Sequence, residues 1–188
     1  MRLFVALDIP EDVRAAVAAF VEKLRPLCRA AHWVRIENAH VTLKFIGEVS
    51  LGKFEEIKKA LTHIRLDAPI YMIFRGTGFF PSQRRPRVFW AGIEAGSELA
   101  ALAGTVEATL ENLGIEKEER AFSPHLTLAR MESPKNLQAL RQAIAAADSL
   151  DFGSDIASEF YLYQSVLKRS GAEYTRLATY RFAEGGPQ

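Results

Sequence analysis

The sequence predicts a single α+β domain over residues 1–188, built as two pseudo-symmetric lobes with an active-site cleft between them. Each lobe is expected to be an antiparallel sheet with helices on its outer side. Extended apolar runs alternate with helical patterns along the chain, and these patterns divide it into two similar halves. Each half contains a strand pattern that begins His-x-Thr-Leu, at His40 and at His125. A chain of 188 residues is long enough to bury one sizeable core.

The first part of the chain is expected to form a strand, a helix, two extended pieces and a second helix. Leu3–Leu7 is an apolar run typical of a buried strand. Residues 10–24 and 54–64 repeat apolar side chains at helical spacing, and residues 32–49 between them contain the two extended pieces. The apolar faces of the helices consist of Val13, Val17, Phe20, Val21 and Leu24, and of Phe54, Ile57, Leu61 and Ile64.

The middle of the chain contains two strand candidates and a third helix. Residues 68–80 and 86–95 are rich in aromatic and β-branched residues, and turn-forming residues separate them. Apolar residues recur at helical spacing from Leu99 to Leu113, and Gly114 ends that pattern.

The last part begins with the second His-x-Thr strand, residues 125–130. A fourth helix is expected next, with Ser133 as its N-cap and Pro134 in its first turn. Its buried stripe consists of Leu137, Leu140, Ile144 and Ala147. Residues 156–167 and 172–182 are expected to be two strands joined by a hairpin turn.

The charge balance argues against a long nucleic-acid groove. Lys and Arg together number 24 and Asp and Glu 23, for a formal net charge of +1, so any contact with nucleic acid should be local. Two basic clusters exist, one with Arg84, Arg85 and Arg87 and one with Lys168 and Arg169. Each is equally well explained as solvated loop charge.

Neither a targeting signal nor cysteine chemistry is expected. The apolar run near the N-terminus is short and is interrupted by Asp8 and Pro10, which predicts neither a signal peptide nor a membrane span. We therefore expect a cytoplasmic protein with no membrane partner. Cys28 is the only cysteine, so neither an internal disulfide nor a cysteine-based zinc site is possible.

The two His-x-Thr motifs carry the chemistry. Successive side chains of a strand point to opposite faces, so His40 and Thr42 share one face, as His125 and Thr127 do. Two imidazoles across a cleft suit displacement at phosphorus, because one neutral His takes a proton from water while one protonated His gives a proton to the leaving oxygen. The threonine hydroxyls can hold the non-bridging phosphate oxygens.

Two alternatives to this chemistry stay open. The histidines could be structural residues on ordinary strands, although two such motifs among four histidines arise by chance only about 1% of the time. The motifs could instead hold a metal, but neither has a second His, Asp or Glu on the same face at short spacing, so no metal is expected. His32 and His63 lack the pattern and are assigned no role.

The chain resembles the 2H phosphoesterases, and specifically the bacterial RNA 2',3'-cyclic phosphodiesterases once named 2'-5' RNA ligases. The resemblance covers nearly the whole chain. It is carried in order by "RLFVALDIP", "NAHVTLKFIGE", "RVFWAGI", "FSPHLTLAR" and "FYLYQSVLKRSGAEYTRL".

Transferred residue by residue, the resemblance implies that His40 and His125 are catalytic. It makes Thr42 and Thr127 phosphate ligands and Arg130 a further positive group. Strand alternation is consistent with the roles of the two histidines and the two threonines, because each pair shares one face of its strand. It places Arg130 on the opposite face from His125 unless the strand ends or bulges first.

The implied reaction opens a 2',3'-cyclic phosphate at an RNA end to leave a 2'-phosphate, with reversible activity on 2'-5' linked oligonucleotides in some relatives. By resemblance, His40 is the acid and His125 the base. Because the two imidazoles make both proton transfers, no cofactor is expected. The protein is expected to be a monomer. Phe45, Phe80 and Phe122 could stack a terminal base, or they could belong to the core. A non-catalytic module that binds a nucleotide or an RNA end through the same cleft is the rival function.

Overall fold

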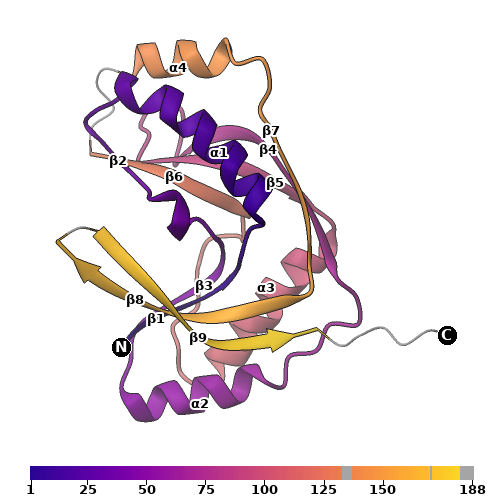
Figure 1. Ribbon diagram of the computed structural model, residues 1–188. Coiled ribbons are helices and arrows are strands. Elements are labelled where there is room, and N and C mark those ends of the chain that lie inside the picture. The colour runs from indigo at the N-terminus through magenta and orange to yellow at the C-terminus, as the bar shows by residue number, and fades with distance from the viewer. Residues whose placement is uncertain (133–136, 170, 183–188) are drawn as a thin grey trace.

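The computed structural model describes residues 1–132, 137–169 and 171–182. Within these residues it contains four α-helices and two antiparallel sheets (Figure 1), which confirms the predicted α+β class. The elements are β1 (Arg2–Leu7), α1 (Glu11–Leu24), η1 (Arg25–Leu27), β2 (Ala31–Trp33), η2 (Ile36–Asn38), β3 (Val41–Glu48), α2 (Leu51–Leu61), β4 (Ile70–Phe80), β5 (Val88–Ala95), α3 (Ser97–Glu111), β6 (His125–Met131), α4 (Gln138–Ala145), β7 (Asp151–Ala157), β8 (Glu159–Lys168) and β9 (Gly171–Arg181).

The two sheets do not coincide with the two halves of the sequence. One has the strand order β3-β1-β8-β9 and the other β2-β6-β5-β4-β7. Strand β2 from the first half therefore joins the five-stranded sheet, and the C-terminal pair β8 and β9 joins β1 in the four-stranded sheet. The chain crosses between the lobes more than once, which ties them together.

One crossing differs from the sequence prediction. The pattern predicts a single strand over residues 156–167, but β7 ends at Ala157 in the five-stranded sheet and β8 begins at Glu159 in the four-stranded sheet. Strand alternation is interrupted at Ser158, because the buried residues Ala157 and Phe160 stand three positions apart. No Gly or Pro marks the interruption, so the sequence is interpreted as one continuous strand. The predicted hairpin after β8 is confirmed, because Lys168 pairs with Gly171.

The helices cover the outer sides of the sheets (Figure 1). Helix α1 packs against β7 and α4, whereas α2 packs against α3, which in turn contacts β3. The start of the fourth helix predicted at Ser133 and Pro134 lies outside the described residues, and α4 is described from Gln138. No helix among the described residues has the length and apolar character needed to span a membrane.

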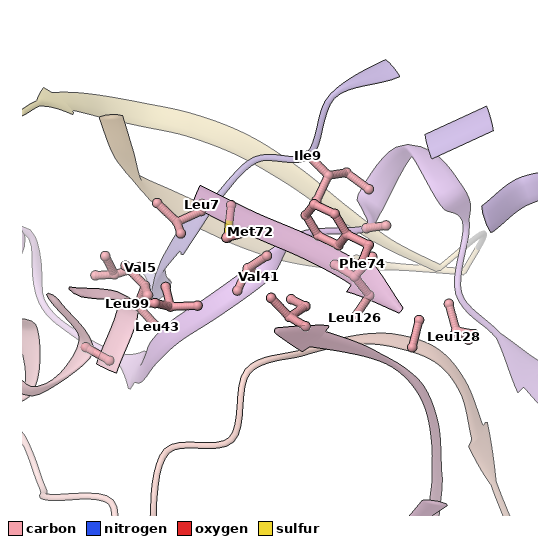
Figure 2. Packing of buried hydrophobic residues seen from close by; sticks show 14 of the residues in the cluster. Val5, Leu7, Ile9, Val41, Leu43, Met72, Phe74, Leu99, Leu126 and Leu128 are labelled. Atoms are coloured by element: carbon pink, nitrogen blue, oxygen red, sulfur yellow. The ribbon is translucent and has the colours of Figure 1, made fainter. Parts of the chain in front are cut away.

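One buried cluster joins the two sheets (Figure 2). It contains the predicted aliphatic pairs of the two motifs, Val41 with Leu43 and Leu126 with Leu128. All four are at most 6% exposed, and each such side chain contributes about 1.5–3 kcal/mol by leaving water. The other residues of the cluster that Figure 2 labels are Val5, Leu7, Ile9, Met72, Phe74 and Leu99. One face of each motif strand therefore packs against the core, and the polar side chains of the motifs lie on the other face.

Candidate active site

The two His-x-Thr motifs lie at the starts of β3 and β6, and these two strands contact each other. His40 directly precedes β3, and His125 is the first residue of β6. Both histidines and both threonines are partly exposed. The two imidazoles also affect each other electrostatically, because a positive charge on His125 lowers the pKa of His40. The structure thus brings together the four residues to which the sequence pointed.

Each motif contains a β-bulge at the same position. In β3, Thr42 pairs with Ala6 and Lys44 with Val5, so Leu43 is an extra residue. In β6, the residues on either side of Leu128 pair with the consecutive residues Phe89 and Trp90, so Leu128 is the extra residue there. A bulge shifts the side-chain alternation by one. Residues beyond it therefore face the side opposite to the one that simple alternation predicts.

The second bulge decides where Arg130 lies. Simple alternation places Arg130 away from His125, but beyond the bulge it is exposed while Ala129 and Met131 are buried. Arg130 therefore shares the face of His125 and Thr127. Its guanidinium also helps to lower the pKa of His125. The positive group expected at the end of this motif therefore lies on the same face of β6 as the histidine.

The first bulge has the same effect on Phe45, which stands five residues after His40 as Arg130 does after His125. Phe45 is 62% exposed. Its ring centroid lies 6.2 Å from that of Phe4, and Phe4 stacks on His40 at 4.6 Å. An exposed aromatic ring on the face of one histidine and a guanidinium on the face of the other make the two halves of the site chemically different.

Both imidazoles are held by the same kind of hydrogen bond. His40 Nδ1 donates to the carbonyl oxygen of Asn38 and His125 Nδ1 to that of Ser123, each at 2.7 Å. Because a carbonyl oxygen only accepts, Nδ1 carries the hydrogen in both rings. The neutral form of each ring then has Nε2 as its acceptor, and Nε2 is the atom that can exchange a proton with a reactant.

Burial lowers the pKa of both histidines below the ordinary value of 6.5. For His40, the bond to Asn38 and the carboxylate of Asp8 oppose that effect. For His125, the bond to Ser123 opposes burial and Arg130 adds to it. Asp8 thus favours the protonated form of one ring, and Arg130 disfavours that of the other.

Asp8 is a residue of the site that the sequence did not identify. It follows β1, whose last residue Leu7 pairs with Val41, so it lies opposite the start of β3. Its carboxylate accepts hydrogen bonds from Arg14 at 3.0 Å and from Arg176 at 2.8 Å. The feature of the sequence that could have indicated this role is that Asp8 is a charged residue directly after a predicted buried strand.

Aromatic side chains surround the two histidines. Phe80 lies edge-on to His125 with ring centroids 5.0 Å apart, and Tyr174 lies edge-on to His40 at 5.3 Å. Phe122, the third stacking candidate, is half-buried and packs against the core cluster. Trp90, which the sequence did not single out, pairs with Thr127, and its buried indole N–H has no acceptor among the described residues.

Comparisons with known proteins agree on one family. Residues 7–90 and 93–174 match the family model described as LigT like phosphoesterase. The chain is 34% identical to a Thermotoga maritima protein named RNA 2',3'-cyclic phosphodiesterase, over 99% of this chain and 97% of that protein. It is 39% identical to an Aeropyrum pernix protein of the same name, over 81% and 87% of the two chains.

Solved structures show the same similarity. The crystal structure of Escherichia coli LigT complexed with 3'-AMP has a TM-score of 0.81 and 28% identity, covering 97% of this chain and 98% of that one. The crystal structure of TT0787 of Thermus thermophilus has a TM-score of 0.78 and 33% identity, covering 99% and 100%. The predicted fold and the resemblance noted in the sequence are both confirmed.

Proposed function

Because the chain belongs to the LigT-like 2H phosphoesterase family, we propose that it hydrolyses the 2',3'-cyclic phosphate at the end of an RNA to a 2'-phosphate. The observation that carries the proposal is the repeated imidazole geometry. Each motif histidine is held through Nδ1 by a carbonyl oxygen two residues before it, which directs Nε2 to the reactants. The names of the curated relatives support the same activity.

The proposed reaction is an in-line displacement at phosphorus. Neutral His125 takes a proton from a water molecule at Nε2 while the water oxygen bonds to phosphorus. The bond from phosphorus to the 3' oxygen breaks on the opposite side, and protonated His40 gives its proton to that oxygen. The phosphate is left on the 2' oxygen. Each proton transfer contributes about 100- to 10,000-fold to the rate.

Two of the electrostatic interactions agree with this division of roles. Asp8 raises the pKa of His40, as an acid needs, and Arg130 lowers that of His125, as a base needs. Burial, His125 and Arg14 lower the pKa of His40 as well, so the order of the two roles comes from the family resemblance. In this scheme Thr42 and Thr127 donate their hydroxyl hydrogens to the non-bridging oxygens, and Arg130 neutralises the charge of these oxygens. Such interactions lower the barrier most when they strengthen in the transition state.

The same site supports joining of RNA ends. If a 5' hydroxyl replaces water as the attacking group, the 3' oxygen leaves as before and a 2'-5' phosphodiester forms. The histidines perform the same proton transfers in both reactions. The scheme uses no metal and no nucleotide cofactor, because the imidazoles move both protons.

Incubation of the purified protein with a 2',3'-cyclic mononucleotide in a chelator tests the proposal. The 2'-phosphate should form, as identified by phosphorus NMR, and the variants His40→Ala and His125→Ala should form almost none. Formation of the 3'-phosphate, or activity that returns only when a divalent metal is added, would count against the mechanism. Binding of the nucleotide without turnover would support the rival, a non-catalytic binding module.

A further inference from the structure

The loop between β4 and β5, residues 81–87, carries three exposed arginines. None of Arg84, Arg85 and Arg87 pairs with a carboxylate among the described residues. By contrast, Arg75 of β4 pairs with both Glu94 and Asp151. In a chain with a net charge of only +1, three such guanidinium groups on one loop form a local positive surface.

Both ends of the loop are fixed to strands that carry the site. The loop follows Phe80, whose ring contacts His125, and the Arg87 N–H donates to the Phe80 carbonyl oxygen at 2.7 Å. The Met131 N–H, at the end of β6, donates to the Arg87 carbonyl oxygen at 2.8 Å. Inside the loop, the Arg85 N–H donates to Ser82 Oγ at 3.3 Å. These bonds fix the backbone of the loop relative to β4 and β6.

Arg130 lies on β6 between the reacting end of the site and the arginines of the loop. His125, Thr127 and Arg130 follow one another on one face of β6, over about 15 Å at the rise of a strand. Arg130 pairs with Val88, the residue that directly follows the loop. Strand β6 therefore leads from the histidine towards the arginines. The nearby carboxylate of Glu132 is engaged by His32 at 2.7 Å.

We propose that Arg84 and Arg85 bind the phosphodiester backbone of the single-stranded RNA that precedes the cyclic phosphate. The inference rests on the proposed function, and it adds which residues bind the RNA chain that precedes the cyclic phosphate. Arginine suits this role because its guanidinium stays charged and forms two parallel hydrogen bonds to a phosphate. Backbone contacts carry no base preference, so this surface binds RNA ends of any sequence.

The test compares two double variants that remove the same charge. Arg84→Gln/Arg85→Gln changes the loop, and Arg2→Gln/Lys59→Gln changes exposed residues of β1 and α2 that form no ion pair among the described residues. Affinity is measured by fluorescence anisotropy with a labelled single-stranded RNA oligonucleotide that ends in a 2'-phosphate, at several salt concentrations. Turnover of a 2',3'-cyclic mononucleotide is measured on the same proteins.

We expect the loop variant to bind the RNA roughly tenfold more weakly than the wild type near physiological salt. The slope of log Kd against log salt concentration should fall by about 1.4, because two phosphate contacts to a single strand are lost. The control variant should match the wild type. Mononucleotide turnover should be unchanged in both, because a mononucleotide has no phosphodiester backbone before its cyclic phosphate.

Three results would overturn the inference. An unchanged Kd in the loop variant, or an equal change in both variants, would show that these arginines do not bind the backbone. A parallel loss of mononucleotide turnover would place them at the reacting phosphate. Failure of the wild type to turn over the mononucleotide would count against the proposed function instead, and the anisotropy measurement would still decide the inference.

Discussion

Replacement of Glu107 by leucine should destabilise the protein by about 3–5 kcal/mol, because it leaves a buried charge without its partner. Lys44 lies directly after the bulge of β3, and its side chain is 4% exposed. Its Nζ donates to Glu107 of α3 and to the Glu116 carbonyl oxygen, each at 2.6 Å. In the variant only the neutral carbonyl would remain. The double variant Lys44→Met/Glu107→Leu removes both charges, and its stability should return close to that of the wild type.

Urea unfolding followed by circular dichroism measures the three free energies of unfolding. Glu56→Leu is a matched control, because Glu56 pairs with Lys53 on the exposed side of α2, and loss of such a pair costs at most about 1 kcal/mol. Two results would contradict the role of the buried ion pair. One is that Glu107→Leu lowers the free energy of unfolding no more than Glu56→Leu does. The other is that the double variant is as unstable as Glu107→Leu alone. The result bears on function, because Lys44 fixes the strand on which Thr42 and Phe45 face the site.

Three further predictions concern the site. Burial lowers the pKa of both histidines below 6.5, so kcat/KM should follow a bell-shaped pH profile with its maximum on the acid side of neutrality; a maximum above pH 7 would contradict this. Because the pKa of each histidine is lower in the folded state, the unfolded state binds more protons. The free energy of unfolding should therefore be highest above about pH 6.5 and should decrease as the pH falls towards the histidine pKa values of the folded protein. His125→Gln should make this decrease smaller, as measured by urea midpoints at several pH values. Thr42→Ala and Thr127→Ala should each raise the barrier by about 2–4 kcal/mol with little effect on stability, and unchanged kcat values would exclude them as transition-state ligands.

The parts of the site that follow from local pattern could be predicted from the sequence. Strand alternation correctly predicted that Val41 and Leu126 are buried and that His40 and His125 lie on the other face. This pattern depends only on the neighbouring residues of one strand and on the presence of a core behind it. Most strand and helix types followed in the same way, but no strand was predicted over residues 151–155, which form most of β7.

Features that depend on the partner strand could not be predicted. The bulge that returns Arg130 to the side of His125 exists because Leu128 has no partner residue in β5, and pairing register cannot be read from one strand. The contribution of Asp8 likewise requires the pairing of β1 with β3. The change of sheet at Ser158 was missed because no Gly or Pro separates β7 from β8.

The central claim is that one imidazole acts on each side of phosphorus, with His40 as the acid. The most direct measurement compares His40→Ala and His125→Ala on the RNA cyclic phosphate and on a phosphodiester whose leaving oxygen is much more acidic. Both variants should lose about 100- to 10,000-fold on the RNA substrate. The activated substrate needs no proton on its leaving group, so it should restore His40→Ala and leave His125→Ala inactive. Preferential rescue of His125→Ala would reverse the roles, and near-normal activity of either variant on the RNA substrate would contradict the two-histidine mechanism itself.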